Sequence, residues 1–379
     1  MARSGMSNAP HYIHNQPDWP NFHWDQETLA APLSKAKVEQ ARLLGRMQSL
    51  GFELQRDAVL KTITADVLKS SEIEGEILNP DQVRSSVARR LGMDIAGMVN
   101  ADRYIDGVVE MMMDATSKYN EPLTSDRLFG WHAALFPSGR SGMRKIRTGA
   151  YRDDAEGPMQ VISGAVGKER VYFEAPEATK IEREVDAFLT WFDSDRSESD
   201  WIVTAALAHL WFVTIHPFED GNGRIARAIS DMSLARSEKS SQRFYSLSSQ
   251  IRQERAAYYE ILEATQKRTT DVTAWLNWFI GCTTRAIESS QSTLANVFAK
   301  GVFWNSFSNV HVNERQRLML NRLFDGFEGK LTTEKWQKVT KSSQRTAIRD
   351  IQDLVEKGAL VQNPEGGRST SYRLAEIKA

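Results

Sequence analysis

One passage, residues 204–236, constrains this chain of 379 residues more than any other, because it joins two helical patterns through a very short loop. Residues 201–215 are almost entirely apolar. The run is too short, and too often interrupted by polar residues, to span a bilayer, so it predicts a buried core helix. Pro217 lacks an amide hydrogen and disfavours the helical conformation of His216, so the helix must stop there. We expect a second helix to begin at Asn222.

The residues around the start of this second helix suit an anion. Glycines on both sides of Asn222 allow the backbone to bend tightly and to approach a ligand closely. The amides lie at a helix N-terminus, where unpaired N–H groups and the helix dipole favour negative charge. Arg224 and Arg227 are three residues apart, so both guanidinium groups can project from one helix face toward that anion. The pattern predicts a phosphate site.

Two further residues of the loop add a metal ligand and a base. Asp220 offers a hard carboxylate oxygen, which suits Mg²⁺ when phosphate oxygens complete the coordination shell. His216 can accept a proton from an incoming hydroxyl as a neutral imidazole. A zinc site of His209, His216 and Asp220 fits the spacing, but zinc would consume the base, and His209 is better explained as a core histidine. A phosphate site with a metal and a base is suited to nucleotidyl transfer.

The passage resembles the signature of the Fic (filamentation induced by cAMP) family, His-Pro-Phe-x-Asp-Gly-Asn-Gly-Arg-x-x-Arg. It is complete here as His216-Pro217-Phe218-Glu219-Asp220-Gly221-Asn222-Gly223-Arg224-Ile225-Ala226-Arg227. The resemblance extends over most of the chain, through the segments WPNFHWD, IRTGAYR…MQVISG…VYFEAP and SSQIRQERAAYYEILEATQK. It implies a mostly α fold, a Fic-type helical bundle with a β-hairpin flap.

The implied activity is transfer of AMP from ATP to a hydroxyl side chain of a target protein, with release of pyrophosphate. His216 would be the catalytic base, Asp220 the Mg²⁺ ligand and Phe218 the anchor of the loop in the core. The residues implied to hold ATP are Gly221, Asn222 and Gly223 for the α-phosphate, and Arg224 and Arg227 for the β- and γ-phosphates. In kinase-like relatives the second glycine is a lysine, so Gly223 argues against that branch.

The resemblance also gives roles to two tyrosines and to the flap. Tyr258 and Tyr259 would lie near the adenine. Because they are adjacent they point in different directions, so at most one can be core while the other faces the site. The flap would dock the target by strand augmentation, through Gln160, Val161, Ile162, Ser163 and Gly164. An ordinary surface hairpin is the alternative.

An early helix closes on Ser70-Ser-Glu-Ile-Glu74-Gly75. Taken alone, this pattern is typical of a solvated helix end with a glycine cap. Beside the complete motif, it resembles the family's inhibitory motif in its N-terminal arrangement. Glu74 would then pair with Arg227 inside the ATP site, occupying the donors that the γ-phosphate needs. Ser70 would orient the helix through a hydrogen bond near the same place.

The remaining chain is expected to be helical apart from the flap strands at 159–162 and 170–173. We expect a flexible tail at 1–17, an N-terminal helical segment with the inhibitory motif at 18–95, the Fic core at 96–295 and a winged-helix domain at 305–379. The helices predicted before the C-terminal domain lie at 25–50, 54–73, 80–91, 96–118, 124–136, 177–193, 200–215, 222–236, 251–266 and 271–290.

The winged helix-turn-helix prediction comes from the order helix, Leu331-Thr332-Thr333, helix, helix and two short strands. Residues 311–379 carry 13 Lys and Arg against 9 acidic residues. This modest positive charge leaves open a DNA-binding transcriptional regulator whose Fic domain senses nucleotide, although winged helices also bind proteins. A third possibility is a de-AMPylase that uses the same site, with Glu74 positioning water.

Composition limits the partners and the compartment. The 48 Lys and Arg nearly balance the 49 Asp and Glu, which excludes a polycation that coats nucleic acid along its whole length. A single cysteine, Cys282, excludes an intramolecular disulfide and any multi-cysteine zinc site, and a reducing, cytoplasmic compartment fits best. We expect ATP, Mg²⁺ and a target protein as partners, self-modification, a homodimer that holds the Glu74 helix, and no membrane association.

Overall fold

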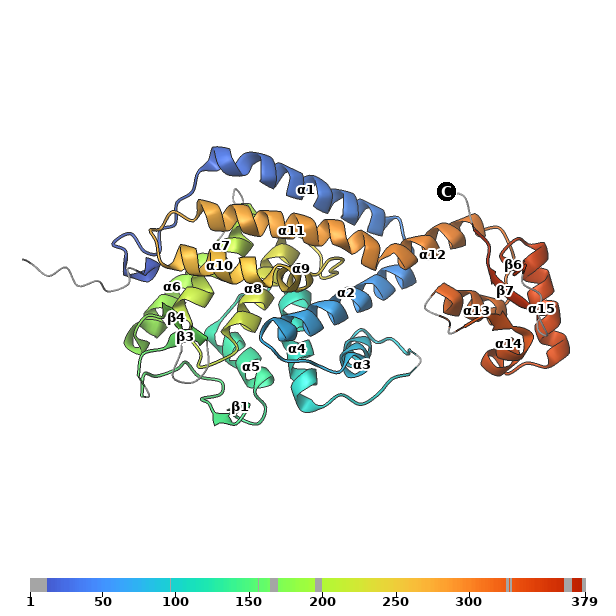
Figure 1. The fold of residues 1–379 in the computed structure, drawn as a ribbon, viewed down its shortest axis with the longest axis horizontal. Coiled ribbons are helices and arrows are strands. Elements are labelled where there is room, and N and C mark those ends of the chain that lie inside the picture. The colour runs from blue at the N-terminus through green and yellow to red at the C-terminus, as the bar shows by residue number, and fades with distance from the viewer. Residues whose placement is uncertain are drawn as a thin grey trace, which may run out of the picture. The chain divides into compact units, whose positions relative to one another are not determined.

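Two helices with few exposed side chains, α7 (Trp201–Ile215) and α8 (Asn222–Glu238), form the centre of the fold (Figure 1). α7 is apolar on all sides, as expected of a helix that other elements surround completely. The structure is a computed structural model that describes residues 12–376 except 96, 156, 164–169, 195–199, 325, 326, 328 and 365–369.

The chain divides into two units. The first contains the residues up to Met47 together with Val59–Ser290, and the second combines Gln48–Ala58 with Gln291–Ala379. The N-terminal helical segment and the core therefore lie mostly in one unit. Among the described residues, no helix is both long enough and apolar enough to cross a bilayer.

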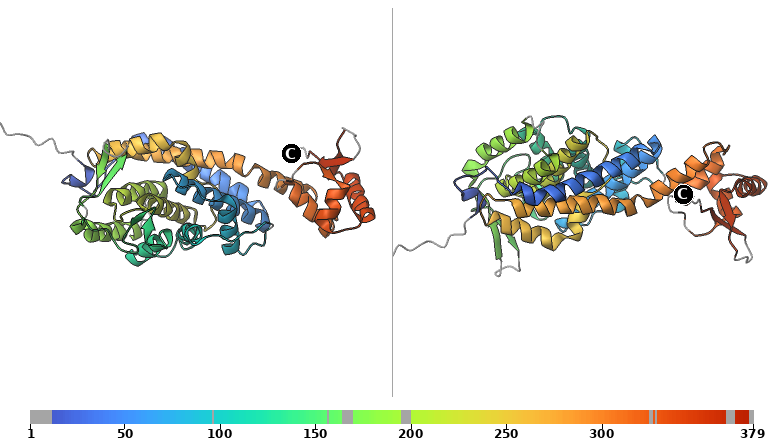
Figure 2. Two further views of the ribbon diagram at one scale, coloured as in Figure 1. Left: turned by 60° about the horizontal axis from the view of Figure 1, so that its bottom comes forward. Right: turned by 90° about the horizontal axis from the view of Figure 1, so that it is seen from above.

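The mostly α prediction is confirmed, and α7 and α8 are surrounded by further helices and by small two-stranded sheets (Figures 1 and 2). The other elements that lie in the first unit or begin or end in it are η1 (Ile13–Asn15), α1 (Gln26–Gln48), α2 (Phe52–Ile73), α3 (Pro80–Arg90), α4 (Arg103–Ser117), α5 (Ser125–Leu135), β1 (Arg140–Ser141), β2 (Arg144–Lys145), β3 (Gln160–Ser163), β4 (Arg170–Glu174), η2 (Ala178–Lys180), α6 (Ile181–Asp193), α9 (Leu247–Gln253), α10 (Arg255–Gln266) and α11 (Thr273–Thr293).

Two of the predicted helices differ from the structure by more than small shifts of their ends. The helix predicted over 96–118 begins only at Arg103, because the Asp102 side chain accepts the backbone N–H of Ile105 at 2.9 Å and caps α4 there. The helix predicted over 251–266 is divided into α9 and α10 at Glu254, whose φ of −102° and ψ of 26° depart from helical geometry.

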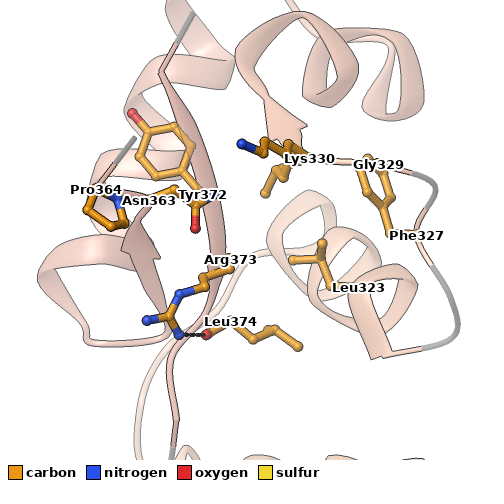
Figure 3. A pocket seen from close by; sticks show the side chains of 10 residues that line it. Leu323, Phe327, Gly329, Lys330, Asn363, Pro364, Tyr372, Arg373 and Leu374 are labelled. Carbon is orange, nitrogen blue, oxygen red and sulfur yellow. Dashed lines mark hydrogen bonds between the residues drawn. The ribbon is translucent and has the colours of Figure 1, made fainter. Parts of the chain in front are cut away.

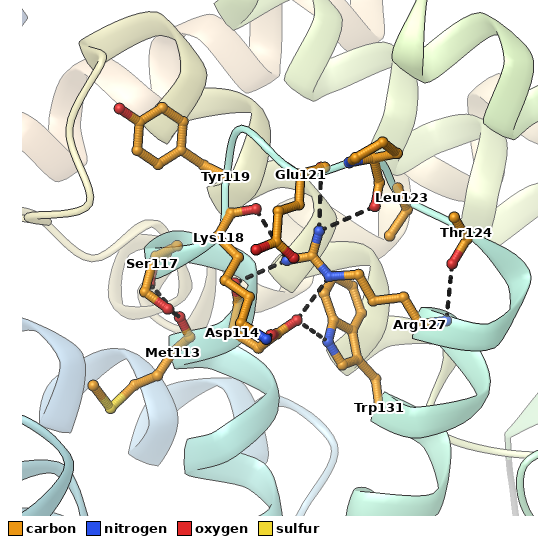
Figure 4. Close-up of polar contacts among 12 residues, drawn as sticks. Met113, Asp114, Ser117, Lys118, Tyr119, Glu121, Leu123, Thr124, Arg127 and Trp131 are labelled. Atoms are coloured by element: carbon orange, nitrogen blue, oxygen red, sulfur yellow. Dashed lines mark hydrogen bonds and ion pairs between the residues drawn. The ribbon is translucent and has the colours of Figure 1, made fainter.

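A polar cluster joins α4 to α5 (Figure 4). Arg127 Nε donates to Asp114 Oδ2 at 2.7 Å, and Trp131 Nε1 donates to the same oxygen at 2.8 Å. The Arg127 guanidinium also donates to the backbone carbonyl of Asp114 at 2.9 Å. Because charge-assisted bonds are directional and strong, this cluster fixes α5 relative to α4.

The predicted flap strands are present as the antiparallel pair β3 and β4. Phe173 of β4 is buried against Tyr12 and Ala175, which anchors one face of the hairpin. On the other face Ile162 and Val171 are 54% and 38% exposed. The smaller pair of β1 and β2 was not predicted, since each strand contributes only two residues.

The second unit contains the unpredicted helix α12 (Ala295–Ser306), followed by the element order predicted for the C-terminal domain. Its antiparallel sheet has the strand order β5-β7-β6, and its core includes Trp336, Ile351 and Leu354. A cavity of about 520 Å³, lined by Leu323, Phe327 and Tyr372 among others, opens beside the sheet (Figure 3). The elements are α13 (Glu314–Phe324), β5 (Leu331–Thr332), α14 (Thr333–Thr340), α15 (Gln344–Glu356), β6 (Leu360–Gln362) and β7 (Ser371–Leu374).

Candidate functional site

The loop between α7 and α8 begins at His216, whose backbone is left-handed, with a φ of 52°. The His216 N–H closes the last turn of α7 by donating to the Phe212 carbonyl at 3.0 Å. A left-handed conformation costs a non-glycine residue energy, so it persists only where the surroundings enforce it.

Arg152 stabilises this left-handed conformation of His216 through hydrogen bonds to the backbone. Its Nε donates to the His216 carbonyl at 2.8 Å, and its backbone N–H donates to the Pro217 carbonyl at 2.9 Å. The Arg152 side chain is fully buried and forms an ion pair with Asp154 at 2.7 Å. Sequence reasoning missed this role, although Arg152 ends the IRTGAYR segment that carries the resemblance.

The middle of the loop is closed by Phe218 and Asn222. Phe218 is fully buried, and its ring stacks on His132 with centroids 4.2 Å apart. The Asn222 side chain accepts the Phe218 N–H at 3.0 Å and donates to the Phe218 carbonyl at 2.8 Å. Since the side chain of Asn222 is committed to the loop, it can offer a phosphate only its backbone N–H.

The His216 imidazole has the tautomer and the protonation state that a general base needs. Its Nδ1 lies 3.2 Å from the Val213 carbonyl, and because a carbonyl oxygen can only accept, Nδ1 carries the proton and Nε2 keeps a lone pair. Burial lowers the pKa of His216 to about 4, although the Val213 carbonyl and nearby acids oppose this shift. The ring is therefore neutral at pH 7.

Asp220 lies on the same loop with 42% of its side chain exposed and accepts a hydrogen bond from the Ser141 hydroxyl. An accessible carboxylate of this kind fits Mg²⁺, which is commonly held by one or two carboxylates plus water and phosphate oxygens. The described parts of the chain contain no cluster of three or more His, Cys, Asp or Glu suited to a metal ion, so the zinc alternative gains no support.

On the first turns of α8, Arg227 is held by the end of α2. Its Nε donates to the Ser70 hydroxyl at 2.9 Å, and its Nη2 donates to Glu74 Oε1 at 2.6 Å. Burial disfavours the charged guanidinium, but Glu74 together with Tyr258 and Tyr259 opposes this, and the pKa of Arg227 is raised. Arg227 Nη1 is buried and has no hydrogen-bond partner among the described residues. It can therefore donate to a ligand that enters the site.

Glu74 also lies directly over Gly223. A Cβ atom added to Gly223 would lie 2.3 Å from Glu74 Oε1, which is closer than any real contact allows. The carboxylate thus occupies the space beside the N-terminal turn of α8, where an anion is favoured. Only a glycine at this position admits it.

Arg224, one turn before Arg227, has a partner that the sequence analysis did not name. Its Nη1 donates to Glu76 Oε2 at 2.8 Å and to the Tyr104 hydroxyl at 2.6 Å, while Nη2 lies 3.7 Å from Asp220. The Arg224 side chain is only 1% exposed. Glu76 follows the resembling motif by one residue, and Tyr104 lies on α4, so neither stood out in the sequence.

Of the two tyrosines, the structure buries Tyr258 and leaves Tyr259 partly exposed. The Tyr258 hydroxyl lies 2.9 Å from His209 Nε2, and His209 Nδ1 lies 3.1 Å from Ser230. His209 is therefore a satisfied core histidine, as predicted. Tyr258 lines the core behind the site, whereas Tyr259 is partly exposed and the Arg255 guanidinium lies 5.1 Å from the centre of its ring.

The flap residues line a groove of about 650 Å³ beside the loop. Gln160 and Ile162 of β3 contribute to it, together with residues of β2 and Glu219 of the loop. Val161 faces the opposite side of the hairpin, and of Ser163 only the backbone pairing with Arg170 is described. Gly164 lies outside the described residues.

Comparison with known sequences identifies the region that contains this loop. Residues 122–234, from the approach to α5 into α8, match the Fic/DOC family profile. The chain therefore contains a domain that is similar to the Fic/DOC family over these residues. Upstream of the Fic domain, residues 12–93 match a domain of unknown function (DUF4172), which includes the segment carrying Ser70 and Glu74.

Relatives of the Fic domain include proteins named protein adenylyltransferase Fic. The protein from Drosophila ananassae is 25% identical over 57% of this chain and 39% of its own length. The protein from Drosophila melanogaster is 24% identical over 59% of this chain and 41% of its own length. The chain thus spans about two fifths of the length of these curated relatives.

Solved structures support the fold. A Fic family protein from Desulfovibrio desulfuricans aligns with a TM-score of 0.56 at 19% identity, covering 92% of this chain and 97% of that chain. A Fic-domain-containing signalling protein from Bacteroides thetaiotaomicron aligns with a TM-score of 0.51 at 20% identity, covering 69% and 97%. The helical Fic fold is therefore shared at low sequence identity.

Proposed function

We propose that this chain transfers AMP from ATP to a hydroxyl side chain of a target protein. The observation that carries the proposal is that a neutral His216 with a lone pair on Nε2 lies at one end of a short loop, and the buried Arg224 and Arg227 lie on the helix α8 that follows it. The adenylyltransferase names of the relatives support the same reaction class.

In the proposed reaction His216 Nε2 removes the proton as the target hydroxyl attacks the α-phosphorus of ATP. A bond forms between the hydroxyl oxygen and the α-phosphorus, and the bond from that phosphorus to the bridging oxygen of the β-phosphate breaks. Pyrophosphate leaves with the electron pair. The backbone amides of Gly221, Asn222 and Gly223 would stabilise the α-phosphate, and the two arginines the leaving group.

Asp220 would hold Mg²⁺, which neutralises phosphate charge when bound. Its carboxylate is exposed and its hydrogen bond from Ser141 orients it without burying it. The second glycine of the loop is retained as Gly223, which supports the adenylyl-transferring branch over the kinase-like one.

We further propose that Glu74 inhibits the reaction. Its carboxylate occupies the Arg227 donor and the space over Gly223 together, so a triphosphate cannot take its full place while α2 keeps this position. Ser70 holds the same guanidinium through its hydroxyl and its carbonyl, both at 2.9 Å, which orients α2 on α8.

Intact mass spectrometry of the protein after incubation with Mg-ATP and lysate proteins tests the proposal. The Glu74→Gly variant should add one AMP group to itself or to a lysate protein. If no variant transfers AMP, the DNA-binding regulator with a nucleotide-sensing Fic domain becomes the better explanation.

The depressed pKa of His216 predicts an unusual pH profile. A base must be unprotonated, and with a pKa of about 4 it stays so well below neutrality. The kcat/KM of the Glu74→Gly form should remain level from pH 8 down to about 5.5, whereas an ordinary imidazole would lose half of it near 6.5. A melting curve at each pH controls for unfolding, and an acidic limb centred near pH 6.5 in the folded protein would contradict the prediction.

For the target protein, we propose docking of an extended segment along β3 in the groove beside the loop. Because Ile162 lines this groove and is 54% exposed, Ile162→Asp should lower target modification roughly tenfold while leaving nucleotide binding unchanged. Val171→Asp is the matched control, since Val171 pairs with Ile162 in the hairpin but does not line the groove. Equal losses in both variants would contradict docking along β3.

We also propose that the C-terminal domain is a winged helix-turn-helix. α14 and α15 are joined by a tight turn at Lys341, whose φ is 51°, and the pair β6 and β7 follows as the wing. The outer face of α15 carries Arg345 and Arg349 but also Ile348, which is 40% exposed. This mixed face favours a protein partner over a phosphate backbone.

A further inference from the structure

Glu76 forms an ion pair with Arg224, as Glu74 does with Arg227, so each arginine on this face of α8 has its own carboxylate partner. Glu76 Oε2 accepts a hydrogen bond from Arg224 Nη1 at 2.8 Å, and the Tyr104 hydroxyl donates to the same oxygen. The Tyr104 oxygen in turn accepts from Arg224 at 2.6 Å. Three elements, the turn after α2, α4 and α8, therefore meet at one guanidinium.

A single turn carries both glutamates. The N–H of Glu76 donates to the Ser71 carbonyl at 3.0 Å, and the N–H of Gly75 donates to the Glu72 carbonyl at 3.1 Å. These two bonds, with Gly75 left-handed at a φ of 87°, make a Schellman motif at the end of α2. The motif places Glu74 and Glu76 on either side of Gly75 in a fixed geometry, so their positions are coupled.

Arg224 is the cation that pairs with the Glu76 carboxylate. Burial and the neighbouring carboxylates of Asp220 and Glu74 raise the pKa of Glu76, and the charge of Arg224 opposes this shift. Arg224 also has a buried Nε without a hydrogen-bond partner in the described structure. The guanidinium therefore has a donor left over for a larger anion than one carboxylate.

We propose that Glu76 is a second competing carboxylate, so that one turn after α2 covers both arginines of the nucleotide site and a triphosphate must displace Glu74 from Arg227 and Glu76 from Arg224. The inference rests on the proposed function for the identity of the ligand. It implies that removing Glu74 alone leaves Arg224 occupied, and that the site reaches full affinity only when both acids are gone.

The test measures binding of α,β-methylene ATP with Mg²⁺ to the full chain by titration calorimetry, because this analogue resists cleavage. Glu76→Gln should lower the Kd about three- to tenfold, a modest factor because the carboxylate is partly solvated. The Glu74→Gly/Glu76→Gln double variant should bind more tightly than Glu74→Gly by a similar factor. Tyr104→Phe should shift the Kd in the same direction by a smaller amount.

Glu72→Gln is the matched control, because Glu72 lies on the same helix but pairs with Lys69 and Arg252 instead of the site arginines. Its Kd should equal that of the parent, and an equal gain in Glu72→Gln would reduce the effect to general charge and overturn the inference. An unchanged Kd between Glu74→Gly and the double variant would overturn it as well. Should Glu76→Gln fail to fold by circular dichroism, Tyr104→Phe decides instead, and an unchanged or weaker Kd there counts against the proposal.

Failure of this inference differs from failure of the proposed function. If the variants bind the analogue more tightly but none transfers AMP, competition by Glu76 is supported and the proposed AMP transfer is contradicted. If AMP is transferred but the Kd does not change in the Glu76 variants, the proposed AMP transfer is supported and competition by Glu76 is contradicted.

Discussion

Replacing His216 with alanine in the Glu74→Gly protein should lower AMP transfer about a hundred- to ten-thousandfold, the usual contribution of a positioned general base. The imidazole is neutral, its Nδ1 is held by the Val213 carbonyl, and its Nε2 is left to accept the hydroxyl proton. Initial rates of AMP incorporation, followed by intact mass spectrometry, measure the loss.

His311→Ala provides the matched control, since His311 is exposed and lies in the other unit. It should transfer AMP at the rate of its parent. Because the residues proposed to bind phosphate are unchanged in His216→Ala, that variant should still bind α,β-methylene ATP. Full AMP transfer by a folded His216→Ala protein would refute the assignment of the base.

Glu74→Gly should raise AMP transfer about ten- to a hundredfold, the value of one charge-assisted hydrogen bond expressed as a binding ratio. The Glu74 carboxylate lies 2.6 Å from Arg227 Nη2 and against Gly223, so its removal frees a donor and the volume beside it. Intact mass spectrometry of both proteins in Mg-ATP, with lysate proteins as targets, gives the ratio.

Glu72→Gln again serves as the comparison, because it removes a carboxylate from α2 without freeing Arg227. Equal transfer by Glu74→Gly and its parent would end the proposal of inhibition. If the parent instead strips AMP from a modified protein faster than Glu74→Gly does, the site works in the hydrolytic direction and Glu74 positions the water.

Local sequence patterns were sufficient to predict most helices. They were insufficient where a capping side chain or a packing contact determines whether a helix forms or where it begins. The uniform apolar character of 201–215 and the proline after it predicted α7 and its end, because both effects act within a few residues. The true start of α4 depended on the Asp102 cap, and α12 depended on burial of residues such as Phe303 in the second unit. Neither effect is visible in periodicity alone.

The residues of the site likewise fall into those that the sequence predicted and those that only the structure revealed. The residues proposed as the base, the metal ligand and the phosphate site are contiguous from His216 to Arg227, so one short segment of chain brings them together. Glu74 was found through a resemblance, but Arg152 and Glu76 reach the loop across 64 and 148 residues of chain and carry no local signal. Tyr258 and Tyr259 could not be assigned until packing buried the first of them.

The order of residues therefore determined the helical class, the position of the loop and the side-chain types on it, since these follow from backbone sterics and side-chain type over short distances. The folded arrangement alone decided which charges face one another: that one turn after α2 reaches both arginines of α8, and that Arg152 holds His216 in a left-handed backbone. Such pairings depend on distances between segments far apart in the chain, and an ion pair has no strength until folding brings its partners together in a buried site.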